Sequence, residues 1–364
     1  MYCNPVKVIE TNNWLGECIS LQKKLAIRKP LVVTSNGNLK RQKLSTVFNS
    51  NSIFSNVKPN PTVESCQKAI NLVQENMFDG VIAIGGGSVM DTAKTLMANF
   101  GTGETDIRKL LHFNEPFPNR VPAIFVPTNH GTGSEVTMWG TIWDMKRKQK
   151  YSISNTDLYP DFAILDASII LSLPLDLSLI SVLDALSHCF EAIWNRNTNQ
   201  ISTDYAIKAI CLILHNVKRL KVEQSNIDLR NILLKASNIA GLAFSNTKTA
   251  AAHSISYPLT INYSIPHGLA AFLPLLSLLR INKGAIENEL DLIIKELEMS
   301  DLSELENDIK RIPSEMLKIN LNGWGVAQSD LLDLAEQSFT QGRMDNNIVE
   351  LNRRDVYNIL QSIY

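Results

Sequence analysis

The stretch DGVIAIGGGSVMDTAK at residues 79–94 decides the fold class. Its apolar run VIAI is typical of a buried strand, three glycines follow, and DTAKTLMANF (91–100) continues with apolar residues at helical spacing. Glycines at such a junction let a ligand approach the backbone, and a helix N-terminus favours phosphate. The stretch therefore predicts a strand–loop–helix unit and a candidate phosphate-binding loop at Gly85, Gly86, Gly87 and Ser88. A tight turn that binds nothing would use the same glycines.

Neighbouring stretches extend this unit into a sheet. Three more apolar runs predict strands, and one segment with helical spacing predicts a helix: PLVVTSNG (30–37), SIFSNV (52–57) and VPAIFVPT (121–128), then SCQKAINLVQENM (65–77). Strands that alternate with helices are typical of parallel βαβ units in a doubly wound sheet. A second loop of small hydroxyls and glycines, PTNHGTGSEVT (127–137), also follows a strand. Two such loops at strand carboxyl ends predict a dinucleotide cleft at a topological switch point.

The second half of the chain has a different period. Strand signals stop between YPDFAILD (159–166) and LPLDLS (173–178), and helical spacing dominates afterwards, for example at 202–217 and 228–244. A chain of 364 residues is also too long for one ordinary core. We predict an α/β nucleotide-binding domain at residues 1–170 and an all-helical metal- and substrate-binding domain at residues 171–364.

Net charge, cysteine content and apolar run length indicate which classes of partner and which compartment to expect. The formal net charge of -1 gives no support to nucleic acid or to an anionic membrane surface. The five cysteines are odd in number and include no CxxC pair, which favours reduced thiols in a cytoplasm over a disulfide framework. No run approaches the roughly 18 apolar residues that span a bilayer. These features predict a cytoplasmic protein.

Four side chains of the second half suit a metal ion. Asp184 and His188, in DALSH (184–188), stand one helical turn apart on an apolar helix, where they would be costly to bury unpaired. His253 and His267 follow in AAHSISYPLTINYSIPHG (251–268). The alternative is an ordinary Asp–His hydrogen bond and satisfied core histidines. Three imidazoles and one carboxylate fit Fe²⁺ or Zn²⁺, which would polarise a substrate oxygen as a Lewis acid.

Several motifs together resemble the iron-dependent (group III) alcohol dehydrogenase family. They run in the family's order from about residue 30 to 285 and comprise NPTVESCQKA (60–69), the two glycine loops, YPDFAILDASIILSLP (159–174), DALSHCFEAIW (184–194) and IPHG (265–268). The resemblance implies a dehydroquinate synthase-like architecture, a homodimer, and reversible hydride transfer between NADPH or NADH and an alcohol or aldehyde at Fe²⁺ (or Zn²⁺).

The resemblance also assigns residue roles. It implies metal ligands at Asp184, His188, His253 and His267, with His267 at the catalytic centre. It implies a cofactor site in which pyrophosphate lies on the first glycine loop, two threonines line the cleft and a lysine reaches the ribose: Gly85, Gly86, Gly87, Ser88, Asp91, Thr128, Thr132 and Lys150.

Three departures from the family pattern stand out. Ser35 replaces an aspartate that binds the adenosine ribose, and Lys40 and Arg41 are close in sequence, so we expect NADPH to be accepted. Solvated surface charges are the alternative for these two cations. Tyr257 replaces a histidine four residues after the third ligand, so proton relay would use Tyr257, water or the cofactor ribose. His130, with Asn129, replaces smaller residues and could touch cofactor or substrate, or change nothing.

Two further motifs predict a specific substrate. KTAAAHSISYPLT (248–260) and SHCFEAIWNRNTN (187–199) are similar to the branch that reduces phosphonoacetaldehyde to 2-hydroxyethylphosphonate. An anionic substrate would need a cation, for which Lys248 and Arg196 are candidates, unless both are ordinary surface charges. The alternatives are a generic short-chain alcohol dehydrogenase, an NAD-assisted lyase or cyclase of the dehydroquinate synthase type, and a non-catalytic paralogue with a broken site.

Overall fold

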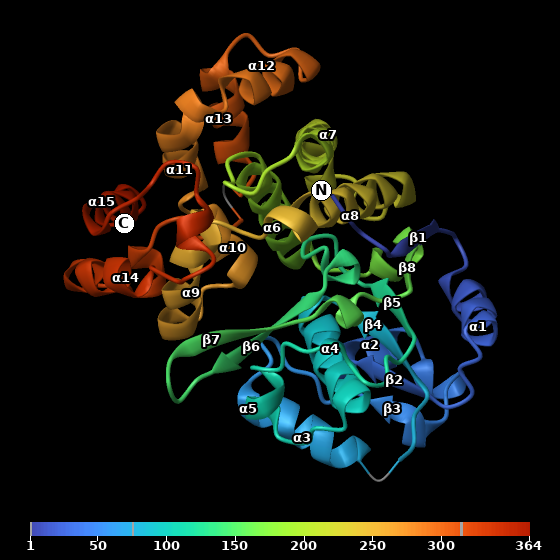
Figure 1. Ribbon diagram of the computed structural model, residues 1–364. Coiled ribbons are helices and arrows are strands. Elements are labelled where there is room, and N and C mark those ends of the chain that lie inside the picture. Colours follow the sequence, from blue (N-terminus) through green and yellow to red (C-terminus); the bar gives the residue numbers. More distant parts are fainter. Residues whose placement is uncertain (1, 75, 314–315) are drawn as a thin grey trace. The chain divides into compact units, whose positions relative to one another are not determined.

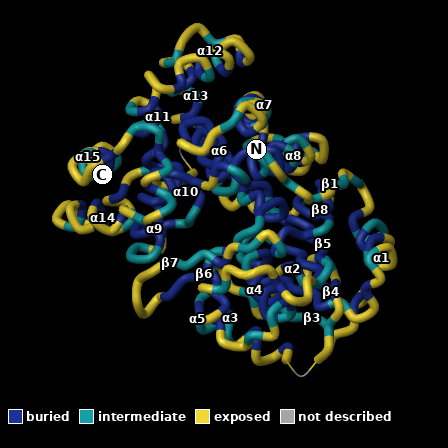
Figure 2. Tube along the Cα trace, viewed as in Figure 1, coloured by how far each residue is buried: buried dark blue, intermediate teal, exposed yellow. Residues whose placement is uncertain are grey.

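The computed structural model describes residues 2–74, 76–313 and 316–364 (Figure 1). The described chain forms two compact units. One unit contains residues 5–129 and 134–170, and the other contains residues 2–4, 130–133 and 171–364. The first is a parallel sheet with helices and the second is helical, so the predicted fold class is confirmed. In both units the inner elements are buried and the loops and outer helical turns are exposed (Figure 2).

The α/β unit is built on a six-stranded sheet of order β1-β8-β5-β4-β2-β3, in which all neighbours are parallel. Its strands are β1 (Lys7–Glu10), β2 (Pro30–Thr34), β3 (Ile53–Phe54), β4 (Gly80–Gly85), β5 (Ala123–Pro127) and β8 (Phe162–Leu165). Every residue of β4 and β5 is buried, as expected for parallel strands covered on both faces. From β2 onward the strands follow the flavodoxin-like doubly wound order, whose switch point lies between β2 and β4.

Helices and one hairpin complete this unit. They are α1 (Trp14–Lys24), α2 (Asn36–Arg41), α3 (Val63–Val73), α4 (Gly87–Thr102), α5 (Ile107–Leu110), and the antiparallel pair β6 (Trp139–Asp144) and β7 (Gln149–Ser154). Helix α3 begins earlier than the sequence predicts because Thr62 and Ser65 form a capping box. The strand predicted at 52–57 shrinks to β3, which follows a 3-10 turn and pairs only with β2.

The helical unit is arranged around α6 (Leu175–Ile193), which contacts α7, α8 and α10. Its other helices are α7 (Gln200–Asn216), α8 (Ile227–Thr247), α9 (Ala251–Tyr263), α10 (His267–Phe272), α11 (Leu275–Asn282), α12 (Glu287–Glu296), α13 (Leu302–Arg311), α14 (Leu331–Gln337) and α15 (Arg353–Ser362). Every residue of α6 from Val182 to Ile193 is buried, so this helix has no solvent face along that length. Any charged group on that segment must find its partners inside the protein.

Over the described ranges, no single helix is long and apolar enough to cross a membrane. One bent pair, His267–Ala285 with Glu287–Glu296, meets the length and composition criteria only when its two halves are taken together.

Candidate metal centre and cofactor cradle

Helix α6 carries the first two candidate ligands, Asp184 and His188, and buries both. The His188 ring is stacked on both sides: Phe244 of α8 lies 4.1 Å away at 7° and His253 lies 4.4 Å away at 19°, measured between ring centroids. Aromatic packing on both faces restricts rotation of the imidazole. The sequence thus places an acid and an imidazole one turn apart, and the packing fixes the imidazole plane.

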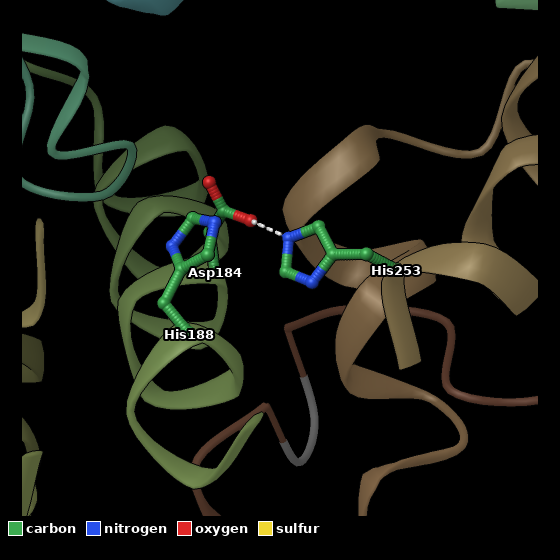
Figure 3. A group of neighbouring side chains, drawn as sticks. All are labelled: Asp184, His188 and His253. Atoms are coloured by element: carbon green, nitrogen blue, oxygen red, sulfur yellow. Dashed lines mark ion pairs between the residues drawn. The ribbon is translucent and has the colours of Figure 1, made fainter. Parts of the chain in front are cut away.

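Helix α9 brings His253 opposite this pair. His253 Nε2 lies 3.5 Å from Asp184 Oδ1, and Figure 3 shows the two side chains facing one another from different helices. One ligand atom from each of Asp184, His188 and His253 can be chosen so that all three atoms lie within 4.8 Å of one another. All three side chains are buried.

The donor atoms of this group fit a metal ion. Asp184 Oδ1 and His253 Nε2 are buried, and neither has a hydrogen-bond partner. Buried polar atoms without partners cost free energy, so their presence in a packed core calls for a ligand. A carboxylate oxygen and imidazole nitrogens at this spacing are the donor set used by Zn²⁺ and Fe²⁺.

His267 borders the group from the first turn of α10. Glycine at position 268 is required here, because a Cβ would come within 2.4 Å of the Ile180 carbonyl oxygen and 2.8 Å of Asp184 Cβ. The missing side chain lets α10 lie against α6 beside Asp184. The His267 ring lies edge-on to His253 at 5.3 Å between centroids. Its ligand atom is outside the group of three whose atoms lie within 4.8 Å of one another.

Tyr257 belongs to the same surroundings. It follows His253 by one helical turn on α9, and its ring lies nearly parallel to that of His267, with 6.3 Å between centroids and 15° between planes. Only 5% of the Tyr257 surface is exposed. A buried phenol beside an imidazole is suited to proton transfer.

Burial and the charges of neighbouring side chains set the protonation states of Asp184, His188 and His253. Burial tends to raise the pKa of Asp184, but the three histidines outweigh it and hold that pKa below its usual value. Burial is the main reason why the pKa of His188 falls to about 4. An ionised carboxylate and a neutral imidazole are the forms that bind metals. Burial also tends to lower the pKa of His253, but the Glu191 and Asp184 carboxylates outweigh it and raise that pKa to about 10.

Glu191 is a functional candidate that the sequence reasoning missed. It is fully buried on α6, and its carboxylate contacts both the backbone and the ring of His253. Burial tends to raise the pKa of Glu191, but His253 outweighs it and lowers that pKa. The available signal was its spacing: Glu191 follows Asp184 by seven residues and His188 by three, so the three share one helix face.

His130 is buried against Arg230 of α8 rather than exposed in its loop. Its Nε2 lies 3.3 Å from an Arg230 nitrogen, and the same guanidinium contacts Ser178 and donates to Leu173 O at 3.1 Å. Burial, followed by the Arg230 charge, lowers the pKa of His130 to about 3. The next residue, Gly131, packs so tightly on α6 that a Cβ would lie 2.6 Å from the Ser181 carbonyl oxygen. His130 therefore helps to hold the loop 130–133, which includes Thr132, in the helical unit.

The glycine loop and the second loop meet at the carboxyl ends of β4 and β5. Thr128 donates its backbone N–H to Gly85 O at 3.0 Å. Gly86 is the N-cap of α4, and a Cβ there would lie 2.5 Å from Asn129 Nδ2. Gly87 is the first residue of α4. The two loops are thus adjacent, with bare backbone at the helix start, which is the arrangement that a pyrophosphate needs.

Ser35 and Asn38 extend this cradle to the carboxyl end of β2. Ser35 caps α2 by accepting from Asn38 N at 3.2 Å, and Asn38 Nδ2 donates to Thr128 Oγ1 at 3.0 Å. The cradle therefore spans the switch point between β2 and β4. Ser88 is already engaged, because its Oγ accepts from Asn60 N at 3.1 Å.

Asp91 lies in a buried cluster centred on Lys94, which the sequence reasoning did not single out. Lys94 Nζ, fully buried, donates to Ser134 and to two neighbours, Thr137 Oγ1 at 2.9 Å and Trp139 O at 2.8 Å. Asp91 Oδ1 accepts from Ser134 Oγ at 3.3 Å. Burial raises the pKa of Asp91 to about 6 and lowers that of Lys94 to about 8. Lys150 of β7 also lowers the pKa of Asp91 by its charge.

The two cations proposed for an anionic substrate are both exposed. Arg196 donates its Nε–H to Asn347 O at 3.0 Å, and Lys248 is the C-cap residue that follows α8. Arg196 thus has a structural contact with the C-terminal segment, and exposed side chains of this kind favour the reading of ordinary surface charges.

Comparisons with known proteins indicate the family of the chain. The chain matches the family model "iron-containing alcohol dehydrogenase" over residues 5–167 and the "Fe-containing alcohol dehydrogenase family, C-terminal" model over residues 178–364. It is 29% identical to 4-hydroxybutyrate dehydrogenase of Clostridium kluyveri over 84% of each chain. It is 33% identical to the bifunctional aldehyde-alcohol dehydrogenase AdhE of Escherichia coli over 63% of this chain and 27% of that protein.

A solved structure covers nearly the whole of both chains. It is sulfoacetaldehyde reductase from Bifidobacterium kashiwanohense in complex with NAD+, with a TM-score of 0.91, 26% identity, and coverage of 100% of this chain and 98% of the other.

Proposed function

This chain belongs to the iron-containing alcohol dehydrogenase family, and we propose that it interconverts a small aldehyde and its primary alcohol with NADPH or NADH at a bound Fe²⁺ or Zn²⁺ ion. The observation that carries the proposal is the buried group Asp184, His188 and His253, bordered by His267 and Tyr257. Asp184, His188, His253 and His267 would hold the ion. When bound, the ion supplies Lewis acidity and the cofactor supplies or accepts a hydride.

The residues of the chain supply position and a proton. Phe244 and His253 hold the His188 ring between them, and Gly268 lets His267 approach Asp184. Tyr257, stacked on His267, moves a proton to or from the substrate oxygen, directly or through water or the cofactor ribose. The apolar neighbours of α6 exclude bulk water from the cluster, which strengthens its electrostatic interactions.

The cofactor would use the cradle at the switch point. Gly85, Gly86, Gly87 and Ser88 would receive the pyrophosphate, while Thr128, Thr132 and Lys150 would line the remaining length. Asp91, whose charge interacts with that of Lys94, would support the first turns of α4. Ser35 offers a neutral hydroxyl, and the Arg41 guanidinium folds back toward Gly37, 3.3 Å from where a Cβ would stand. A cation beside a neutral residue favours acceptance of a 2′-phosphate, and therefore of NADPH.

The finer substrate proposal is phosphonoacetaldehyde. Its support is the similarity of two motifs to that branch, and the names of two relatives, which act on sulfoacetaldehyde and on 4-hydroxybutyrate. Both of those compounds carry an acidic group on a short chain. The exposure of Arg196 and Lys248 leaves the recognition of that group to other residues.

Location and assembly are part of the proposal. The five cysteines are free in the structure and four are buried, which suits a reducing cytoplasm. A homodimer follows from the family resemblance, and light scattering after gel filtration would measure it.

The test is anaerobic NADPH and NADH oxidation, followed at the absorbance of the reduced cofactor, on Fe²⁺-loaded protein. The aldehydes are phosphonoacetaldehyde, sulfoacetaldehyde and neutral short-chain aldehydes. A preference for phosphonoacetaldehyde supports the finer proposal. A preference for neutral aldehydes retains the reductase and removes the phosphonate. Oxidation with none of them, despite bound metal, contradicts the reductase and favours an NAD-assisted lyase.

A further inference from the structure

The Glu191 carboxylate contacts His253, one of the candidate metal ligands, through both of its oxygens. Its Oε1 accepts from the His253 backbone N–H at 3.0 Å, and its Oε2 is paired with His253 Nδ1. Glu191 and His253 are both buried, with 0% and 2% of their surfaces exposed. Two contacts from one carboxylate to one residue fix both the helix position and the ring orientation of His253.

The ring contact decides which nitrogen of His253 is available. A carboxylate can only accept, so Nδ1 must carry the proton that it shares with Glu191. The other nitrogen, Nε2, faces Asp184 Oδ1 at 3.5 Å, and it is the one that can release its proton and bind an ion. A carboxylate behind a ligating imidazole is a recurrent way to fix its tautomer and raise its basicity.

The backbone contact decides where His253 stands. Helix α9 begins at Ala251, and its N-cap, Ala250, provides no side-chain hydrogen bond. The first N–H groups of a helix have no partner within the helix. Glu191 reaches from α6 to satisfy the one at His253, and its negative charge suits the positive end of α9. One side chain thus joins the helix of Asp184 and His188 to the helix of His253.

We propose that Glu191 is a positioning residue of the metal site, which holds His253 with Nδ1 toward Glu191 and Nε2 toward the ion. The inference rests on the proposed metal-dependent function. It differs from a purely structural cap, because a cap would stabilise α9 without changing the affinity for metal.

The test is Glu191→Gln, measured as Zn²⁺ affinity of apo protein by competition with a chromophoric chelator, beside thermal unfolding of the same apo protein. The amide replaces one of the two carboxylate oxygens with an NH₂ group that only donates, so it cannot reproduce both contacts, each of which uses its own oxygen to accept from His253. We expect Zn²⁺ affinity to fall by about 10–100-fold, the usual effect of losing an outer partner of a ligand. Unchanged affinity with a lower unfolding temperature would show a cap alone and overturn the inference.

A matched control is Asp166→Asn. Asp166 is a buried carboxylate of the α/β unit that accepts from Trp14 N at 2.9 Å and Ser168 N at 2.8 Å. This variant is expected to lose stability with Zn²⁺ affinity unchanged. If it weakened Zn²⁺ binding as much as Glu191→Gln, the effect would be general destabilisation, and the inference would fail.

Two further variants separate the possible failures. Glu191→Asp retains two acceptors on a shorter side chain, so it should bind Zn²⁺ more tightly than Glu191→Gln. The reverse order would contradict the role of the acceptor. Asp184→Ala should abolish binding: if it does while Glu191→Gln binds normally, only the Glu191 inference fails. Weak Zn²⁺ binding by the unchanged protein would remove the proposed function as well.

Discussion

The two units each bury a cluster of charged and polar side chains. The two clusters differ in whether their buried polar atoms form hydrogen bonds within the protein. Lys94 has more acceptors around its Nζ than the three protons it can donate, and Asp91 accepts from the same neighbourhood. In the helical unit, Asp184 Oδ1 and His253 Nε2 are equally buried but lack hydrogen-bond partners. A cluster whose polar atoms hydrogen-bond to one another, here called closed, stabilises the fold. A cluster whose buried metal-donor atoms lack hydrogen bonds, here called open, can bind a ligand through those atoms.

This difference separates the roles of the two clusters. Replacing a side chain of the closed cluster, which comprises Lys94, Asp91 and the acceptors of Lys94, should first lower the free energy of unfolding. Replacing a side chain of the open cluster, which comprises Asp184, His188, His253 and His267, should damage ligand binding and turnover first, because Asp184 Oδ1 and His253 Nε2 make no hydrogen bond within the protein.

The largest effect is expected for His267→Ala. The variant should lose on the order of a thousandfold or more in kcat/KM, which is about 4 kcal/mol or more of transition-state stabilisation. Its far-ultraviolet circular dichroism should remain that of the unchanged protein. His215→Ala, at an exposed position of α7, is the matched control and should retain turnover. Full activity of His267→Ala would contradict its place in the open cluster.

The next effect tests the closed cluster. Lys94→Met should lower the free energy of unfolding by about 3–5 kcal/mol, since it leaves the acceptors and Asp91 buried without their cation. Zn²⁺ affinity, measured by chelator competition on the folded fraction, should stay within error of the unchanged protein. A stable Lys94→Met protein with lost Zn²⁺ affinity would reverse the proposed division.

A smaller, pH-dependent effect comes from His130, whose facing charged group is Arg230. Its pKa of about 3 in the folded state lies below the usual 6.5, so between these values the unfolded chain binds more protons. The stability contributed by neutral His130 is complete above pH 6.5 and is lost as the pH falls. From pH 7 to 5, apo protein should lose about 2 kcal/mol from this residue.

The measurement is urea unfolding of apo protein at both pH values, with His130→Gln as the comparison. The variant should lose about 2 kcal/mol less than the unchanged protein on acidification. Equal losses in the two proteins would mean that His130 does not keep a depressed pKa in the folded state.

The smallest effect concerns the cofactor cradle. Ser35→Asp should preserve the cap of α2, because aspartate caps helices as well as serine does. Its charge should repel a 2′-phosphate, so the ratio of kcat/KM for NADH to that for NADPH should rise by about tenfold, or about 1.4 kcal/mol. Ser35→Asn, a neutral cap, is the control. An unchanged ratio in Ser35→Asp would separate Ser35 from the adenosine ribose.

The sequence predicted what depends on local pattern. The apolar strand before Gly85 and the helix after it were readable from periodicity, and so was the shared face of Asp184 and His188. The fold class and the family were readable from the order of such segments. The close approach of Gly268 to α6, by contrast, was not predicted from the sequence and is seen only in the structure.

What the sequence did not predict depends on contacts between distant segments. Glu191 resembles any acid of an amphipathic helix until α9 is packed beside it. Lys94 looks like a surface lysine until the 134–139 segment surrounds it. His130 lies in sequence between two segments of the α/β unit but packs in the helical unit. The reason is its contact with Arg230, which is a hundred positions away. Spacing places Glu191 on the same helix face as Asp184 and His188, but no local pattern shows which distant group any of these three residues contacts.

The most direct test of the central claim is an anomalous difference map at the iron absorption edge, from crystals of protein grown anaerobically with Fe²⁺. We expect one strong peak bounded by Asp184, His188, His253 and His267, with His253 Nε2 toward it and Nδ1 toward Glu191. No peak there, or a peak bound by other side chains, would contradict the claim that these residues form the metal site.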